Sequence, residues 1–369
     1  MARAVSRSDT RKWRSERVSR NLVLLYTVPL QTAASNRDLQ SQIDSLRAGD
    51  IRALSRAISA VENRAPGSSE LLKALFPHTG HARVIGLTGP PGAGKSTLVD
   101  QLARLYRKTK NSHSSRKESG LHVKADENCT VGIVAVDPTS PYTGGAILGD
   151  RIRMQEHFAD PGIYIRSMAT RGSLGGLART TADVTSVLDA ARREVILIET
   201  VGVGQDEVDI VRLAEITIVI LVPGMGDDVQ TIKAGIMEIA DIFVINKSDY
   251  DGAERVEREI RGLQSLAIRH DGWTPPIVKT VASQGSGIEE LAAAIEEYER
   301  YLAQENRALK KSVEHWQERL VEMLRDTMLE KARSQFGGNM AALAAEVAEH
   351  KRDPYTLVEE IAGGGKPGE

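Results

Sequence analysis

The stretch GPPGAGKST, residues 89–97, matches the phosphate-binding pattern G-x-x-x-x-G-K-[ST] in full. The apolar segment RVIGLT at 83–88 precedes it, and TLVDQLARLYRK at 97–108 follows it with apolar residues at helical spacing. In such a strand, loop and helix, backbone N–H groups and the positive end of the helix dipole face the phosphate oxygens of a nucleotide. The stretch therefore predicts a P-loop and the α/β fold that carries it.

Two residues of this loop have distinct expected roles. We expect Lys95 to reach the β- and γ-phosphates, which makes it a candidate catalytic residue, and Ser96 to bind Mg²⁺ through its hydroxyl. The remaining residues of the loop are expected to bind the nucleotide; they are Gly89, Pro90, Pro91, Gly92, Ala93, Gly94 and Thr97.

Short apolar segments recur along the chain after the P-loop, with helical patterns between most of them. They are VGIVAVD (131–137), EVILIET (194–200), ITIVILV (216–222), DIFVINK (241–247) and the weaker PIVKTVA (276–282). Buried strands that alternate with helices predict a mostly parallel sheet flanked by helices on both faces. The fold class expected is therefore an α/β P-loop NTPase.

The sequence divides into four parts. Apolar residues at helical spacing run from Asp38 to Asn63, Gly49 predicts a break there, and Ser68 or Ser69 is expected to cap a further short helix. A long helical region follows the sheet from residue 288 to about 335, with two short helices after it. The expected parts are a basic extension (1–36), an N-terminal helical segment (37–80), the P-loop domain (81–287, with a polar insertion at 110–129) and a C-terminal helical region (288–363).

A second motif, NKSD at 246–249, names the base. It follows an apolar strand and matches the N-K-x-D signature of GTP-binding proteins. The carboxylate of Asp249 can accept hydrogen bonds from N1–H and the exocyclic amine of guanine, whereas adenine would leave it unpaired. Asn246 and Lys247 would brace the loop. The sequence therefore predicts GTP and GDP as the bound nucleotides.

Three acidic residues are candidate ligands of Mg²⁺ beside Ser96. Asp137 and Glu199 each end an apolar strand, and Asp150 lies in a glycine-rich loop. A carboxylate at the carboxyl end of a parallel strand next to the P-loop strand can hold the ion directly or through water. Glu199 is also a candidate catalytic residue, together with Gly202, whose N–H would reach the γ-phosphate.

The residue that positions the attacking water is not evident. In Ras-type proteins a glutamine directly follows the switch glycine, but Val203 stands in that position and Gln205 comes two residues later. We therefore expect slow intrinsic hydrolysis that a partner can stimulate.

Composition limits the partners. The formal net charge of −2 gives no general attraction to nucleic acid or to an anionic membrane, and no apolar run has the length of a membrane helix. A single cysteine excludes a disulfide framework and a cysteine-rich metal site. We expect a cytoplasmic protein, or one of the mitochondrial matrix if the Arg- and Ser-rich residues 1–36 are a transit peptide.

Five blocks in order resemble the MeaB/ArgK/MMAA family of P-loop GTPases over about residues 40–360. They are GPPGAGKST, VDPTSPYTGGAILGDRIRM, TRGSLGGLARTT, ETVGVGQDE and NKSD. The resemblance implies a chaperone of adenosylcobalamin-dependent acyl-CoA mutases, chiefly methylmalonyl-CoA mutase. It also implies a homodimer joined through the C-terminal helices and a metal site built from the P-loop serine and the three acids named above.

The same resemblance implies a third switch at 222–233 that signals to the mutase, with Asp227, Gln230 and Lys233 as the signalling residues. It also implies that Ala282 contacts guanine. Several positions depart from the family pattern; they are Arg151, Ile152, Asp228, Val229, Thr231 and Val281. Val281 lacks the hydroxyl of the family's guanine loop. The changes in the third switch leave open whether the mutase is of the methylmalonyl-CoA, isobutyryl-CoA or ethylmalonyl-CoA type.

Three other functions remain to be weighed. A kinase that phosphorylates a transport-system protein would need an acceptor site with a catalytic base, for which the sequence shows no motif. A nickel or zinc metallochaperone should carry a histidine-rich tract or clustered cysteines, and the eight histidines are scattered. A scaffold that binds GTP without useful turnover remains open because of Val203.

Overall fold

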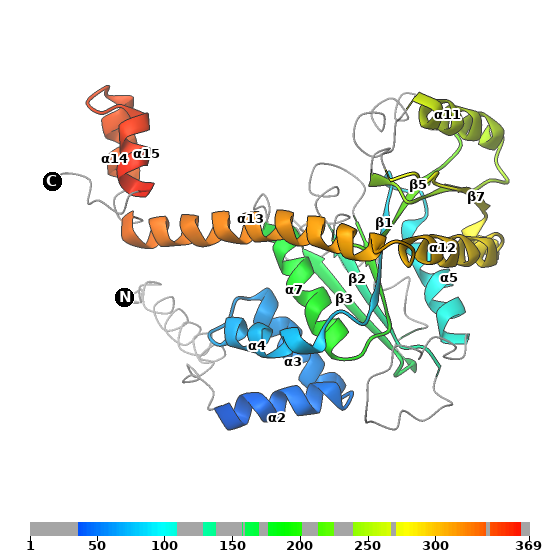
Figure 1. Ribbon diagram of the computed structural model, residues 1–369, viewed down its shortest axis with the longest axis horizontal. Helices are drawn as coiled ribbons and strands as arrows, with labels where there is room; N and C mark the ends of the chain where they lie inside the picture. Colours follow the sequence, from blue (N-terminus) through cyan, green and yellow to red (C-terminus); the bar gives the residue numbers. More distant parts are fainter. Residues whose placement is uncertain are drawn as a thin grey trace, which may run out of the picture.

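The structure is a computed structural model (Figure 1). It describes residues 36–108, 128–137, 157, 159–169, 176–200, 213–224, 239–266, 271–336 and 340–362. The expected insertion at 110–129 and the basic extension at 1–36 therefore lie almost wholly outside the described residues. Within the described part, no helix combines the length and the hydropathy needed to cross a membrane.

A seven-stranded parallel sheet forms the centre of the described part. Its strand order is β3-β2-β4-β1-β5-β6-β7, and every neighbouring pair runs parallel. The strands are β1 (Arg83–Thr88), β2 (Val131–Asp137), β3 (Ile163–Ala169), β4 (Val195–Glu199), β5 (Ile216–Leu221), β6 (Ile242–Asn246) and β7 (Ile277–Thr280). The expected parallel α/β fold is confirmed, with the P-loop strand β1 in the middle of the sheet.

The sequence patterns did not predict one strand, β3, which pairs with β2 at the edge of the sheet. Its middle residues Arg166 and Ser167 are polar and only partly buried, so the segment lacks the continuous apolar run of a central strand. Arg166 pairs with Glu62 of a preceding helix, and the hydroxyl of Tyr164 donates to Ser55 on the same helix. Contacts with that helix thus account for Tyr164 and Arg166, although not for Ser167.

Helices cover both faces because alternate strand residues point in opposite directions. On one face α5 (Lys95–Lys108) and α12 (Ile288–Leu302) pack on Ile85, Leu197 and Ile218. On the other face α3 (Ile51–Glu62), α4 (Ser68–Leu75) and α7 (Gly176–Ala190) pack on Ile196 and Ile198, and α11 (Ala253–Leu266) packs on β5 and β6.

The N-terminal helices break where the sequence indicated. α2 (Asn36–Arg47) ends before Gly49, which has a left-handed φ of +88°, and the carboxylate of Asp50 then caps α3 by accepting from the backbone N–H of Arg52 at 2.7 Å. The expected cap of α4 was wrong. Gly67 occupies the N-cap without any side-chain hydrogen bond, and Ser68 is already the first helical residue. A short 3-10 turn, η1 (Phe76–His78), follows α4.

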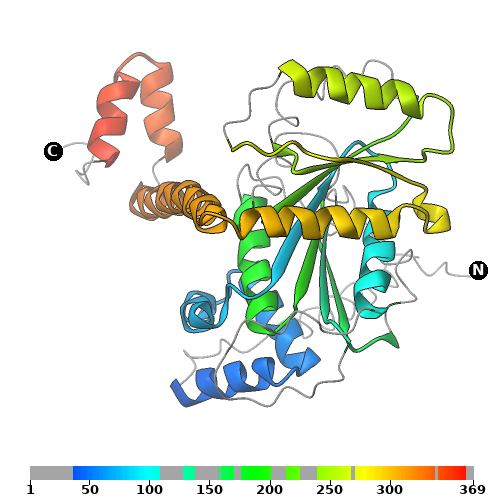
Figure 2. The ribbon, with the colours of Figure 1, turned by 45° about the vertical axis from the view of Figure 1, so that its right-hand side comes forward.

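The long helical region expected from residue 288 to about 335 is two helices, α12 and α13 (Arg307–Phe336), rather than one continuous helix. Residues 303–306 separate α12 from α13, and Glu305 and Asn306 both take left-handed φ values. Leu291, Ile295 and Tyr298 of α12 lie in the core beside α5. The packing of the P-loop domain therefore continues through α12, beyond the expected boundary at residue 288. α13 leaves the body, and α14 (Met340–Ala348) and α15 (Pro354–Ala362) stand at its far end (Figures 1 and 2).

Candidate functional site

The P-loop connects the end of β1 to the start of α5, and two of its glycines are required by close packing. Gly89 has φ +149°, and a Cβ there would lie closer than 3.0 Å to the carbonyl oxygen of Ile220 on β5. Gly94 has φ +90°, and a Cβ there would meet the side-chain amide of Asn246 equally closely. Any side chain at either position would collide with a neighbouring strand or with the guanine loop, and would strain the backbone.

Lys95, the first residue of α5, folds its side chain back over the loop. Its Nζ donates to the carbonyl oxygens of Gly89 at 2.8 Å and Pro90 at 3.1 Å, and the residue is only 6% exposed. The ammonium therefore lies within the loop whose backbone is suited to phosphate. Of the remaining loop residues Ala93 is buried, whereas Pro91, Gly92 and Thr97 face solvent.

The neighbouring residue, Ser96, contacts one of the expected metal ligands. Its hydroxyl donates to Oε1 of Glu199 at 2.6 Å, and Glu199 is 4% exposed. Strand register explains the contact, because Glu199 pairs with Leu87 of β1 on one side and with Ala135 of β2 on the other. A hydroxyl and a carboxylate are the hard oxygen ligands that Mg²⁺ prefers, so these two residues fit that ion.

The other expected metal ligands are only partly placed. Asp137 ends β2 two residues after Ala135, so its backbone lies at the same edge of the sheet, but its side chain is outside the described residues. Asp150 and Gly202 lie entirely outside them. Among the described residues no three His, Cys, Asp or Glu side chains gather as a metal site.

The guanine motif is joined directly to the P-loop. Asn246, at the end of β6 and 2% exposed, donates from Nδ2 to the carbonyl oxygen of Ala93 at 2.7 Å. Its Oδ1 accepts from the hydroxyl of Thr280 at 3.0 Å and from the N–H of Ala282 at 3.1 Å. One amide thus holds three loops together. Sequence reasoning missed Thr280, and its only signal was its position just before the expected guanine loop.

The rest of the motif turns outward. Lys247 has a left-handed φ of +55°, and the Ser248 N–H donates to the Thr280 carbonyl oxygen at 3.1 Å. After this turn Asp249 is exposed, so its carboxylate is open to the donors of a base. Ala282, by contrast, is buried at 2% exposure under the same loop.

The expected third switch begins beside the guanine motif, although most of it is not described. Asp227, Gln230 and Lys233 lie outside the described residues. The part of this segment that the structure describes reaches Gly224. A Cβ placed on Gly252, three residues after the guanine motif, would lie 3.8 Å from the Cβ of Pro223. Pro223, at the start of the expected switch, therefore lies near the residues that follow the guanine motif.

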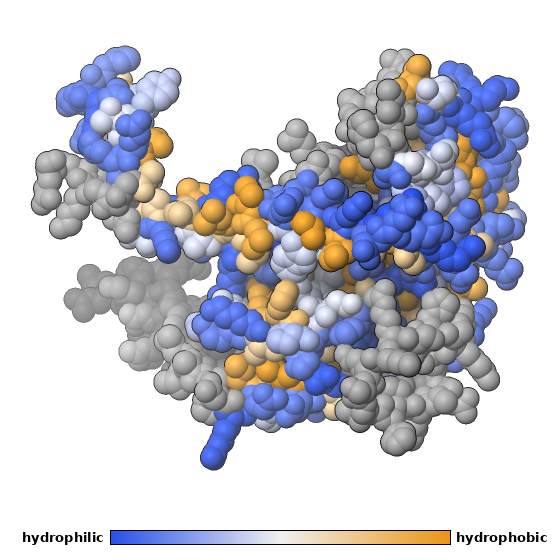
Figure 3. All heavy atoms as spheres, in the orientation of Figure 1, coloured by the Kyte–Doolittle hydropathy of each residue, from blue (hydrophilic) through white to orange (hydrophobic). Residues whose placement is uncertain are grey.

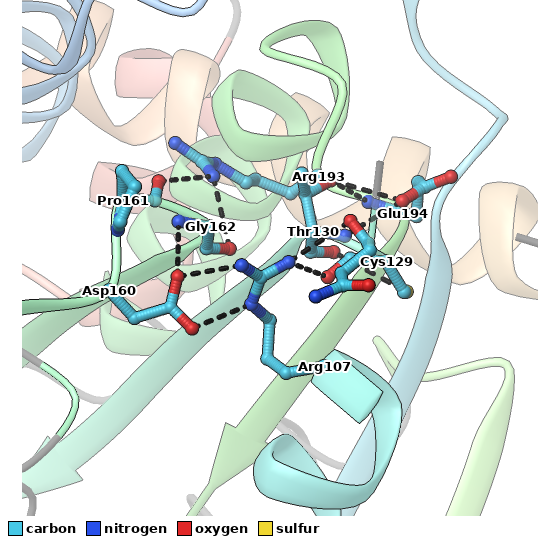
Figure 4. A network of polar contacts seen from close by, with 9 residues as sticks. Arg107, Cys129, Thr130, Asp160, Pro161, Gly162, Arg193 and Glu194 are labelled. Carbon is cyan, nitrogen blue, oxygen red and sulfur yellow. Dashed lines mark hydrogen bonds and ion pairs between the residues drawn. The ribbon is translucent and has the colours of Figure 1, made fainter. Parts of the chain in front are cut away.

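The far end of α5 is fastened by a network around Arg107 (Figure 4). Its guanidinium donates to both carboxylate oxygens of Asp160, at 2.8 and 2.7 Å, and to the carbonyl oxygens of Asn128 and Cys129. The hydrogen bond from Arg107 is the main reason that the pKa of Asp160 lies below its ordinary value. Arg107 thereby holds the P-loop helix against the starts of β2 and β3, and it joins the two ends of the expected insertion.

A parallel α/β sheet with β1 at its centre, a phosphate-binding loop after β1 and an N-K-x-D loop after β6 define a P-loop GTPase. The phosphate end of the site consists of three features. They are the two glycines that have no room for a side chain, the buried Lys95, and the hydrogen bond between Ser96 and Glu199. The Asn246 bridge ties that end to the base loop.

Comparison with known proteins places the chain within this class. The family model described as "Methylmalonyl Co-A mutase-associated GTPase MeaB" matches residues 54–336, and the chain belongs to that family. The protein is therefore a GTPase of the family that its sequence motifs resembled.

Curated relatives agree with the assignment. A putative GTPase of Pyrococcus abyssi is 46% identical over 331 residues, which cover 88% of this chain and 97% of that protein. The GTPase ArgK of Escherichia coli is 35% identical and covers 73% of this chain and 78% of its own length. The mitochondrial methylmalonic aciduria type A homolog of Mus musculus is 36% identical, covering 63% of this chain and 52% of that protein.

A solved structure agrees with the fold. The crystal structure titled LAO/AO transport system kinase superposes with a TM-score of 0.64 and 25% sequence identity, and it covers 90% of this chain and 99% of its own.

Proposed function

We propose that this GTPase couples its nucleotide state to the loading and protection of an adenosylcobalamin-dependent acyl-CoA mutase of the methylmalonyl-CoA mutase type. The observation that carries the proposal is the family match over residues 54–336, which spans both nucleotide motifs and whose description names that mutase. The mouse relative, named for methylmalonic aciduria, supports the same client class. We also propose that the protein is cytoplasmic, or lies in the mitochondrial matrix if residues 1–36 form a transit peptide, and the mitochondrial mouse relative supports the second location.

In this proposal the nucleotide is GTP or GDP with Mg²⁺. Ser96 and Glu199 would hold the ion together with Asp137 and Asp150, and the ion would neutralise charge on the β- and γ-phosphates. Lys95 binds the same phosphates, and the Gly202 N–H orients the γ-phosphate. The hydrogen bond from the Ser96 hydroxyl to Glu199 holds these two oxygen ligands together at the carboxyl ends of the strands, which is here called the phosphate edge of the sheet.

Asp249 selects guanine, supported by Asn246, Lys247 and Ala282. Because Val203 offers no group to orient water, we propose slow hydrolysis that the mutase accelerates through Asp227, Gln230 and Lys233. Pro223, at the start of this switch, lies near Gly252, three residues after the NKSD motif, and this proximity supports a route from the base loop to the switch.

We further propose a homodimer joined through α13 and the helices after it. Figure 3 shows hydrophobic residues along the part of α13 that faces the viewer. Large apolar side chains on this helix remain substantially exposed; they are Leu309, Val313, Leu320, Val321, Leu324, Met328 and Leu329. A contiguous apolar surface of this kind marks a protein interface, and a second copy of the same helix would cover it.

The test is GTP hydrolysis by the purified protein, alone and with a methylmalonyl-CoA-type mutase. We expect a slow basal rate that rises with the mutase, and Lys233→Ala should remove the increase while leaving the basal rate intact. Lys73→Ala, which removes an exposed lysine of α4, is the matched control and should still respond. A rate that no such mutase changes would refute the client assignment but not GTP hydrolysis.

The solved structure titled as a kinase favours a second candidate, transfer of the γ-phosphate to a transport-system protein. Radiolabelled GTP distinguishes the two, because a kinase leaves the label on the acceptor protein whereas a GTPase releases inorganic phosphate. A protein that binds GTP without measurable release or transfer would instead be a nucleotide-gated scaffold.

A further inference from the structure

The start of α13 is fixed to the base of the sheet. In its first turns Lys311 donates from Nζ to the carbonyl oxygen of Glu215 at 2.7 Å, to Oδ2 of Asp241 at 2.8 Å and to the hydroxyl of Tyr298 at 2.9 Å. Glu215 directly precedes β5, Asp241 directly precedes β6, and the Asp241 side chain is only 4% exposed. Three acceptors on one ammonium make this end of α13 a fixed point.

Farther along, α13 meets the body mainly through charge. Arg319 pairs with Asp183 of α7 at 3.1 Å, and Asp326 pairs with Arg179 of α7 at 3.4 Å. These two ion pairs are here named the α7–α13 clasp. The apolar residues of α13 listed above are exposed. Two further contacts lie beside the clasp in the described part: the edge contact of Trp316 with Phe76, and an ion pair of Glu330 with Arg64 in which both side chains are more than half exposed.

Burial makes the clasp sensitive to the loss of either partner. Burial raises the pKa of Asp183 against the opposing effects of Arg319 and Arg179, and it lowers the pKa of Arg319. Both side chains of this pair are about four-fifths buried. A partly opened clasp would weaken the ion pair before water reaches both charges, which favours either a closed or a fully separated arrangement.

The other half of the clasp lies at the phosphate edge of the sheet. β3 ends at Ala169, which pairs in register with Asp137 of β2, and α7 starts seven residues later at Gly176. Arg179 and Asp183 stand one turn apart in the first two turns of α7, and Figure 1 shows α13 passing across that end of the helix. α7 is packed on the sheet through Val184 and neighbouring residues. Because Arg179 and Asp183 lie in its first turns, any shift of those turns moves one side of the clasp.

We propose that the α7–α13 clasp relays the nucleotide state of the phosphate edge to the C-terminal helices, with α13 pivoting about Lys311. This rests on the proposed nucleotide-dependent signalling, and it assigns that signalling a second route, separate from the switch at 222–233. Arg179, Asp183, Arg319 and Asp326 are positioning residues in this relay, since the ion pairs that they form join α7 to α13 and not to the P-loop or the NKSD motif.

Hydrogen–deuterium exchange of the full-length protein tests the relay, with GDP and Mg²⁺ in one arm and a non-hydrolysable GTP analogue and Mg²⁺ in the other. We expect the amides of α13 after Arg319 to exchange differently in the two arms. Arg319→Gln should reduce that difference about fivefold, the size of a weak allosteric coupling. Asp183→Arg combined with Arg319→Asp should restore it, because opposite charges again face each other. Arg179→Gln, which opens the other pair, provides a second test if Arg319→Gln does not fold.

The matched control is Arg255→Gln, which opens an exposed ion pair with Glu259 on α11 and should leave the difference unchanged. Equal exchange of α13 in both arms of the wild-type protein, with the P-loop amides protected by nucleotide, would overturn the relay alone. A full difference in Arg319→Gln would also overturn it. Failure of nucleotide to protect the P-loop amides would overturn the relay and the proposed function together.

Discussion

Asn246→Ala is the sharpest test of how the site is held together, because one buried amide joins the P-loop, β6 and the loop after β7. The substitution removes the hydrogen bond to the Ala93 carbonyl oxygen and both bonds to Oδ1, from Thr280 and Ala282. Asn246 and Thr280 are at most 2% exposed, so water cannot replace the lost partners without a rearrangement of the loops.

The expected cost follows from these three bonds. A net contribution of about 1 kcal/mol for each intramolecular hydrogen bond gives a loss of about 3 kcal/mol in the free energy of unfolding. In a domain of this size 1 kcal/mol lowers the thermal midpoint by about 2–4 °C, so the midpoint should fall by roughly 6–12 °C. The affinity for GDP should fall as well, because the P-loop and the base loop lose their common support.

Urea and thermal unfolding measure the first effect, and titration with a fluorescent GDP analogue measures the second. Gln42→Ala is the matched control, since it removes a side-chain amide from the exposed surface of α2 and should change the stability by less than about 0.5 kcal/mol. Asn246→Asp separates the two ends of the amide: it keeps an acceptor for Thr280 and Ala282 but sets a carboxylate oxygen against the Ala93 carbonyl oxygen. If Asn246→Ala unfolds at the same urea concentration as Gln42→Ala, the bridge does not support the site as argued.

Three further predictions concern the network around Arg107. Because burial raises the pKa of Cys129 to about 12, a thiol reagent at about pH 8 should modify the folded protein far more slowly than the protein in urea, and rapid stoichiometric labelling of the folded chain would contradict this. The lowered pKa of Asp160 means that its contribution to stability is present above its ordinary value of 3.8 and is lost as the pH falls through the lower folded value. The difference in urea midpoint between wild type and Asp160→Asn should therefore be full at about pH 7 and shrink by about pH 3; a constant difference would exclude the ion pair as its source. Because Arg107 joins the ends of the insertion through Asn128 and Cys129, replacing residues 110–127 by a short glycine–serine linker should leave the thermal midpoint and GDP affinity nearly unchanged, and loss of folding would show that the insertion is structural.

The central strands and the nucleotide motifs could be predicted from sequence because their signals are local. A strand buried on both faces must be apolar throughout, and the phosphate loop needs its glycines and lysine at fixed spacing. The edge strand β3 carried no such signal, since Arg166 is polar for a reason that lies elsewhere in the chain, on Glu62. The break between α12 and α13 was hidden as well, because neither glycine nor proline marks residues 303–306.

The contacts between the motifs of the site could not be predicted from the motifs themselves. Ala93 and Asn246 are 153 positions apart, and the hydrogen bond between them depends on β1, β5 and β6 lying side by side in the sheet. Ser96 and Glu199 meet for a similar reason, because β4 and not β2 is the neighbour of β1. Each motif predicted a type of ligand, whereas strand order decided which motif touches which.

The packing at Gly89 has a genetic consequence. Every amino acid that a single-base change in a glycine codon can encode carries a Cβ. At this position a Cβ would collide with the backbone carbonyl oxygen of Ile220 on β5, which cannot move aside by changing a side-chain rotamer. The obstacle is a main-chain atom, so no second substitution at residue 220 can relieve it. All missense alleles of this codon should therefore fall into one class of null alleles, and revertants should arise by restoring glycine itself.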